Sequence, residues 1–490
     1  MGRGTIPGRA FARRRMLEPD PHRQHFNLTL AVLALGGVSF ALLQSLVAPA
    51  LPNIQHSLHT SESTVSWVLT GYLLSASVAT PIIGRLGDMF GKERVMVIVL
   101  VMLGLGTLLA AVATSISMLI AARVIQGIGG GIFPLAFGII RDEFPREKVS
   151  GGIGLMSALL GIGGGLGVVL AGVIVDHLTY HWLFWIPLVA IIGATVLAHF
   201  FVPESPIKTP GRVSWLGAAL MSSGLAGVLL AISEGNSWGW LSARTLGLLA
   251  AGGVLLVLWV AAELRADEPL VDMQMMQIKG VWTTNLVAFL IGVGMYSSFI
   301  LVPQLVQLPS STGFGFGASV TAAGLFLLPA TVMMLLVGSL AGRLDVRFGS
   351  KPPLIAGAGS AAASFLLLAV AHRQRIDIYV AMTLLGIGIG LAFAALANLI
   401  VQSVDQHQTG VATGMNTVMR TVGGAVGGQV AAAFLANNVD VSGLPTEHAF
   451  TLAFVVCAAA LVVSLGAATL IPGRSRPVPG AEVAAAAGGD

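Results

Sequence analysis

Arg123 and Gln126 stand inside an apolar run, residues 117–140, that is long enough to cross a lipid bilayer. A second arginine, Arg420, lies inside another apolar run at 410–437. A charged side chain at such a depth costs several kcal/mol unless it faces a water-filled cavity or polar partners. Such buried cations are therefore candidates for a functional site that faces a polar cavity.

Both arginines lie too deep to reach water directly through lipid. At about 1.5 Å per residue, Arg123 is about 9 Å inside the outer end of its run, and Arg420 is about 15 Å from the inner end of its own. None of the 22 acidic residues falls in the middle of an apolar run. The alternative to a functional site is that neighbouring carbonyls, with Gln126 or Gln44, saturate Arg123 and fix the register of its helix.

The composition predicts the elements that position these residues. Of the 490 residues 55% are hydrophobic and 10% are charged, and the mean hydropathy is +0.86. A hydrocarbon core of about 30 Å needs about 20 apolar residues per helix, so the chain is expected to be an all-α polytopic membrane protein. Fourteen runs of that length are found at 28–51, 65–84, 95–113, 117–140, 151–175, 182–202, 214–233, 245–264, 281–307, 318–341, 353–371, 377–403, 410–437 and 447–471.

The basic residues predict the orientation, because lysine and arginine are retained preferentially on the cytoplasmic side. Placing the N-terminus inside puts most of the 26 basic residues in cytoplasmic segments, and Arg373 and Arg375 are exceptions on an outer loop. We therefore expect a plasma-membrane protein with both termini in the cytoplasm. The net charge of +4 then reports topology and gives no reason to expect nucleic-acid binding.

An internal repeat predicts two related halves. The sequence GRLGDMFGKER at 84–94 has a weaker copy, GRLDVRFGSK, at 342–351. Duplicated helix bundles around a central pathway are typical of secondary transporters. The expected organisation is a basic cytoplasmic tail, an N-terminal six-helix bundle, connectors with two inserted helices, a C-terminal six-helix bundle and a second cytoplasmic tail, at 1–27, 28–202, 203–280, 281–471 and 472–490.

At these residues the chain resembles the major facilitator superfamily, and more narrowly its fourteen-span drug:proton antiporters of the EmrB/QacA type, over roughly 28–471. The first loop motif of the superfamily, G-x-L-x-D-x-x-G-(R/K)-(R/K), is matched except that Glu93 stands at the second basic position. The stretches RVIQG, HWLFWIP and SEGNSWGW are similar to further landmarks, at 123–127, 181–187 and 233–240. The matching loop residues are Gly84, Leu86, Asp88, Gly91 and Lys92.

The loop motif also has a physical interpretation of its own. Asp88 can pair with Lys92 or Arg94, or meet a helix N-terminus of the opposite bundle. In the family this contact latches the outward-facing conformation, so the resemblance implies a conformational switch made of Gly84, Asp88, Gly91, Lys92 and Arg94. The alternative is that these charges merely flank a short loop.

A glycine-rich stretch, GIGGGLGVVLAG at 161–172, resembles the antiporters' fifth-span motif. Gly163, Gly167 and Gly172 match, whereas the family's proline and a further glycine are replaced by Val168 and Ala171. The three glycines are expected either to gate the transport path or to allow close packing of helices.

The first span lacks the acid that the family places in the membrane. In LLQSLVAPALP, residues 42–52, Leu43 stands at the position of that aspartate. Proton coupling would then use a carboxylate nearer the surface, and Glu234 and Asp88 are the candidates. A cavity holding Arg123 and Arg420 would be electropositive and would suit neutral or anionic amphiphiles better than lipophilic dications.

Other polar side chains in the spans are either ligand contacts or interhelical hydrogen bonds: Gln44, Asn285, Tyr296 and Asn416. Together these features predict a monomeric, non-enzymatic exporter of hydrophobic small molecules in the bilayer, working by alternating access and energised by the proton gradient, without cofactor or metal. An importer or facilitator of an organic anion without proton coupling is the alternative. A scaffold or sensor would show no substrate-dependent flux.

Overall fold

The computed structural model describes residues 26–205, 208, 213–440 and 443–472. The predicted cytoplasmic tails lie almost wholly outside these residues. Within the described ranges, fourteen helical segments are long and apolar enough to cross a membrane. They coincide with the fourteen predicted runs, so the all-α polytopic fold class is confirmed.

The helices fall into two groups of six spans separated by an inserted pair. The N-terminal group contains α2 (Phe26–Leu46), α3 (Leu51–Ser57), α4 (Glu62–Phe90), α5 (Lys92–Ala111), α6 (Ile116–Gly127), α7 (Ile132–Glu143), α8 (Arg146–His177) and α9 (Trp182–Phe201). The inserted segment contains α10 (Trp215–Trp238), α11 (Ala243–Glu263) and the short α12 (Met273–Gln277). The C-terminal group contains α13 (Lys279–Gln307), α14 (Val320–Phe348), α15 (Lys351–Val370), α16 (Arg375–Ser403), α17 (Thr409–Asn437) and α18 (Glu447–Leu470).

Apolar burial follows the same division. One hydrophobic cluster is drawn almost entirely from α2 to α9, and a second from α13 to α18 and their loops. A third cluster packs α10, α11 and the α12 connector against α16 and α17. The inserted pair therefore packs on both groups, because α10 contacts α4 of the N-terminal group and α17 of the C-terminal group to a similar extent.

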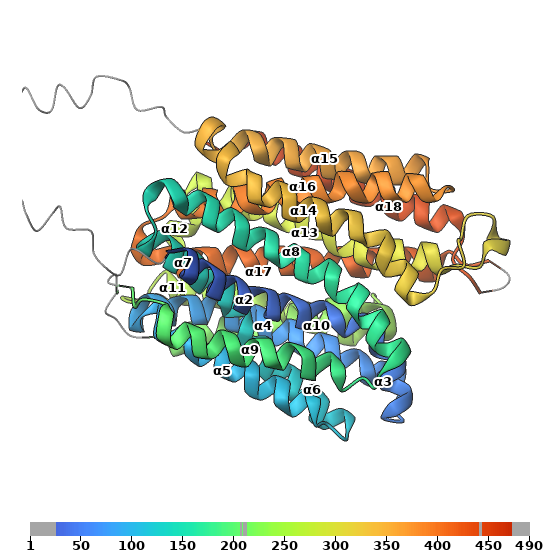
Figure 1. Cartoon of the computed structure of the whole chain (residues 1–490), viewed down its shortest axis with the longest axis horizontal. Coiled ribbons are helices and arrows are strands. Elements are labelled where there is room, and N and C mark those ends of the chain that lie inside the picture. The colour runs from blue at the N-terminus through green and yellow to red at the C-terminus, as the bar shows by residue number, and fades with distance from the viewer. Residues whose placement is uncertain (1–25, 206–207, 209–212, 441–442, 473–490) are drawn as a thin grey trace, which may run out of the picture.

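The two groups meet along long helix pairs. α8 packs along α14, and α4 packs along α17. In Figure 1 the N-terminal helices, blue to green, lie below the yellow to red C-terminal helices, with α8 and α17 near the boundary. Side chains of α8 and α17 can therefore reach both halves.

The repeated motif differs from the predicted loop. Gly84 and Asp88 lie inside α4, which continues to Phe90, and the turn consists of Gly91 alone. Gly91 has φ +111°, and Gly349 in the second copy has φ +80°, a region that glycine adopts without strain. The motif is thus the end of a helix, and Asp88 lies in the last turn of α4.

The fourth span is also not one regular helix. A 3-10 segment, Ile128–Gly131, separates α6 from α7. Its glycines pack where a Cβ would crowd neighbouring helices; at Gly130, for instance, it would meet the Thr80 hydroxyl at 2.5 Å. The close approach of these helices explains why a run of small residues stands here.

Candidate functional site

Asp88 joins the two halves of the protein at the ends of α4 and α17 that were predicted to face the cytoplasm, which we call the inner ends. Its carboxylate accepts hydrogen bonds from the backbone N–H groups of Gly410 (3.1 Å) and Val411 (3.3 Å) in the first turn of α17. The side chain is 1% exposed. A carboxylate at a helix N-terminus satisfies unpaired N–H groups and complements the helix dipole. The helix N-terminus that was predicted as a partner of Asp88 is therefore that of α17, in the opposite half of the protein.

Lys92 extends the contact within the N-terminal half. Its ammonium lies 3.4 Å from the Asp88 carboxylate and 2.8 Å from that of Asp142 at the end of α7. Asp142 also accepts a hydrogen bond from Ser205 at 2.5 Å. Because Lys92 and both acids are buried, removal of Lys92 would leave two buried carboxylates without the cation that they share. Arg94 lies outside this cluster, in an exposed pair with Glu204.

The second copy of the motif makes a corresponding contact from the other side. Asp345, near the end of α14, accepts a hydrogen bond from the Ser150 hydroxyl near the start of α8. It also accepts one from Ser350, which precedes α15. Asp345 is buried. Each copy of the repeat thus places a carboxylate against the first turns of a helix in the opposite half.

Arg141, which sequence reasoning missed, adds a third bridge. From α7 it donates to the backbone carbonyls of Val404 (2.8 Å) and Asp405 (3.2 Å) and to the Thr409 hydroxyl (2.5 Å). A cation is favoured near carbonyls at the end of a helix, here α16. The sequence showed only a basic residue at the inner end of the fourth span. Its partners could not be identified from the sequence because most of them are backbone carbonyls. We call the contacts of Asp88, Asp345 and Arg141 the inner latch.

Arg123 is fully enclosed in the N-terminal half. It donates to the carbonyls of Val68 (3.0 Å) and Leu43 (3.1 Å) and to Gln126 (2.7 Å). Its guanidinium lies 4.0 Å from the centre of the Tyr72 ring. This placement matches the interpretation in which Arg123 holds neighbouring helices in register.

Gln126 and Gln44 have different partners. The side-chain amide of Gln126 donates a hydrogen bond to the Thr107 hydroxyl at 3.0 Å. Gln44, one of the predicted partners of Arg123, instead donates to the Tyr296 hydroxyl at 2.9 Å. The Gln44–Tyr296 bond links α2 with α13 and so joins the two halves.

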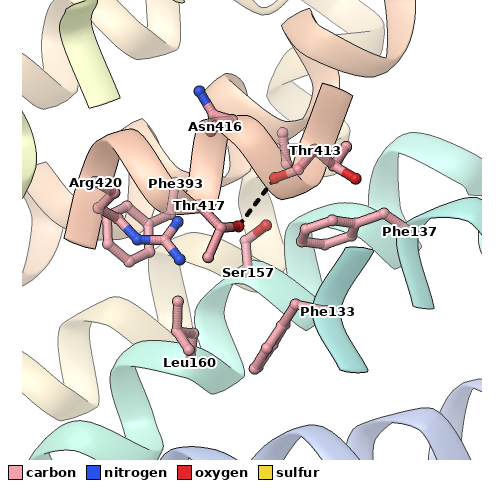
Figure 2. Close-up of a pocket in the computed structure, with 10 residues that line it drawn as sticks. Phe133, Phe137, Ser157, Leu160, Phe393, Thr413, Asn416, Thr417 and Arg420 are labelled. Atoms are coloured by element: carbon pink, nitrogen blue, oxygen red, sulfur yellow. Dashed lines mark hydrogen bonds between the residues drawn. The ribbon is translucent and has the colours of Figure 1, made fainter. Parts of the chain in front are cut away.

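A small pocket between the halves contains Arg420. Figure 2 shows Arg420 beside the Phe393 ring, with Phe133 and Phe137 across the pocket. The guanidinium carbon lies 4.5 Å from the centre of the Phe393 ring. The remaining lining residues are Ser157, Leu160, Ala397, Thr413, Asn416 and Thr417. Its water-accessible volume of about 10 Å³ holds one water molecule at most, so this conformation is closed around the site.

The structure separates residues that were grouped in the prediction. Arg420 and Asn416 line the pocket, whereas Arg123 and Gln126 lie outside it. Asn416 donates to Asn285 at 2.9 Å, an interhelical hydrogen bond within the C-terminal half. The pocket that contains Arg420 is therefore not shared with Arg123.

Glu234 lies near the outer end of α10. Its carboxylate accepts from Ser237 at 2.6 Å, and its side chain is buried. Two residues on, Asn236 donates to the Gln429 side chain of α17 at 2.9 Å. The neighbourhood of Glu234 therefore links the inserted pair to the C-terminal half.

The predicted gating glycines lie at close helix contacts. Added Cβ atoms would collide with Ala41 at Gly163 and with Ser45 at Gly167, both on α2. At Gly172 the Cβ would meet Thr321 of α14 at 2.7 Å. Close packing is thus their observed role, and a role in gating stays a prediction.

Comparison with known proteins gives a consistent result. The sequence model of the Major Facilitator Superfamily matches residues 33–428. Multidrug resistance protein 3 of Bacillus subtilis (strain 168) is 31% identical over 318 residues, which cover 64% of this chain and 59% of the relative. The tetracenomycin C resistance and export protein of Streptomyces glaucescens is 28% identical over 338 residues, covering 69% and 62%.

The matches to curated relatives cover only part of their length, and the sequence identity to the solved structures is low. The chain spans about 60% of the length of the curated relatives it matches. The crystal structure of the human organic anion transporter MFSD10 (TETRAN) has a TM-score of 0.66 and 18% identity, covering 92% of this chain and 100% of that chain. At that identity the likeness shows the fold alone.

Proposed function

This chain belongs to the major facilitator superfamily, and from that premise we propose that it exports hydrophobic small molecules by alternating access in exchange for protons. It would act as a carrier and not as an enzyme. We further propose a monomer in the cell membrane with both termini in the cytoplasm, divided into functional segments at 28–202, 203–280 and 281–471. Relatives named for multidrug resistance and antibiotic export support the substrate class.

The inner latch is the observation that carries this proposal. Asp88 bonds to the first turn of α17, Asp345 bonds to Ser150 of α8, and Arg141 bonds to the end of α16. All three contacts join opposite halves at their inner ends. A rocking carrier must break such contacts to open toward the cytoplasm and remake them to close.

Proton exchange is the less direct part of the proposal. The pocket lining contains no carboxylate among the described residues, so a proton carrier must lie elsewhere. Asp88 is proposed for this role because protonation would weaken its bonds to α17. Glu234 is the second candidate, at the outer contact between α10 and α17.

The experiment uses inverted membrane vesicles that carry an established proton gradient. Neutral, anionic and cationic amphiphiles are added in turn, while a pH-sensitive dye reports the gradient and labelled compound reports uptake. Uptake that collapses the gradient only in vesicles containing the protein supports proton-coupled export. Uptake without proton movement would favour the uncoupled organic-anion facilitator, and no uptake of any class would contradict a transport function.

A further inference from the structure

Arg420 is a buried cation that contacts the Phe393 ring but has no polar partner among the described residues. It lies about 15 Å along α17 from the inner end, and its side chain is 9% exposed. Within the described part of the chain it makes no hydrogen bond or ion pair, and its Nε–H is buried and unbonded. Arg123 makes three hydrogen bonds, and its Nη2 is buried and unbonded. A buried guanidinium that is left unsatisfied, like that of Arg420, is costly unless another molecule completes it.

The surroundings of Arg420 combine polar and apolar surfaces. Hydroxyl groups of Ser157, Thr413 and Thr417 line one part of the pocket. Aromatic rings, including Phe133 and Phe137, line another part. The pocket lining contains no acidic residue, and Arg420 forms no ion pair within the described part of the chain.

These features favour an anion that carries an apolar body. A guanidinium binds a carboxylate, sulfonate or phosphate through two parallel hydrogen bonds. The three hydroxyl groups donate to carbonyls of their own helices and would have to rotate to donate to the head group. The phenylalanine rings can cover the apolar part. Because the lining comes from α7 and α8 on one side and α16 and α17 on the other, separation of the halves would enlarge the pocket.

We propose that Arg420 binds the anionic head group of amphiphilic substrates and makes the protein selective for them. This inference rests on the proposed export function and specifies its substrate class. A chloride ion would bind the same guanidinium but would not need the phenylalanine rings of the pocket. The experiment must therefore separate an amphiphilic anion from an inorganic one.

The test compares pyrene butyrate with its uncharged methyl ester. Uptake is measured in inverted vesicles, and binding is measured as the shift in melting temperature of the purified full chain. Arg420→Gln should reduce uptake and affinity for pyrene butyrate by about tenfold or more, the size of a charged hydrogen bond, and leave the ester within about twofold. Arg420→Lys should retain an intermediate preference, since it keeps the charge without the fork. Arg265→Gln, at an exposed arginine, is the matched control.

The possible outcomes distinguish this inference from the transport proposal. Equal loss of pyrene butyrate and ester in Arg420→Gln, or no loss of either, would overturn the inference. An Arg420-dependent shift in melting temperature with NaCl but not with pyrene butyrate would overturn it as well. Arg420-dependent binding of pyrene butyrate without any uptake would support the site and contradict transport. Absence of both binding and uptake would contradict both proposals.

Discussion

Ser150 and Asp345 form a hydrogen bond that joins α8 in the N-terminal half to α14 in the C-terminal half. Its counterpart is the bond between Asp88 of α4 and Gly410 of α17. Asp345 stands one position earlier in its copy of the repeated motif than Asp88 does, opposite Gly87. The duplication of the chain is nevertheless expressed as two carboxylates that close the inner end from opposite sides.

The Ser150–Asp345 bond predicts a coupled effect of mutation. Ser150→Ala and Asp345→Asn should each accelerate amide exchange in the first turns of α8. The double variant should show little more than Asp345→Asn alone, because residues that share one interaction are not additive. Hydrogen–deuterium exchange over residues 146–152 measures the effect. Fully additive increases would mean that the two side chains act separately.

Gly84 should be needed for closure of the inner end. A Cβ at this position would collide with the backbone carbonyl of Gly410, and a backbone atom cannot move aside as a flexible side chain can. Gly84→Ala should destabilise the closed state by about 1–3 kcal/mol, the usual cost of overpacking. The expected readout is faster amide exchange at the start of α17. Gly253→Ala, whose Cβ would meet nothing within 4 Å, should leave that exchange unchanged.

Arg141 should hold the end of α16 in place. Arg141→Gln loses charged donors to the Val404 and Asp405 carbonyls, and a bond to a charged group contributes about 1.5–3 kcal/mol. Exchange of the segment 403–409 should rise, and transport should slow. Arg141→Lys should be intermediate because a lysine cannot reproduce the planar fork. A lysine variant as defective as the glutamine variant would indicate that geometry alone matters.

Arg123 should be required for stability and not for substrate choice. Arg123→Ala would remove the hydrogen bonds from the guanidinium to the Leu43 and Val68 carbonyls, and a bond to a charged group contributes about 1.5–3 kcal/mol. The melting temperature of the purified protein should fall with or without substrate. Arg420→Gln removes no hydrogen bond among the described residues, so its melting temperature without ligand should stay close to wild type. The reverse order of stability would contradict these assignments.

The sequence predicted the spans well because bilayer thickness dictates the length of an apolar helix. The acid–helix contact at Asp88 could also be anticipated, since a carboxylate complements any helix N-terminus. A contact of Asp345 with the opposite half could be anticipated only from the weak copy of the motif at 342–351. Carbonyls and Gln126 were anticipated as one alternative for Arg123, and the structure shows both. Which carbonyls bind Arg123 and Arg141 could not be predicted, because every residue type offers one.

The division between Arg123 and Arg420 also required the structure. Both are arginines at depth in an apolar run, and a single sequence does not show which way each side chain points. Tertiary packing closes carbonyls around Arg123, whereas the pocket between the halves leaves Arg420 unpaired. The broken fourth span similarly follows from close packing of its glycines against α4.

The most direct test of alternating access measures whether Asp88 controls opening at the inner end. Thr413, which lines the pocket and is 2% exposed, is replaced by cysteine in a Cys457→Ser background. A membrane-impermeant maleimide is then added to inverted vesicles from the cytoplasmic side. Asp88→Asn should raise the labelling rate roughly fivefold to thirtyfold, because a charge at a helix N-terminus contributes about 1–2 kcal/mol in a buried setting. Unchanged labelling, or an equal rise in the exposed control Asp267→Asn, would contradict a latch that holds the inner end closed.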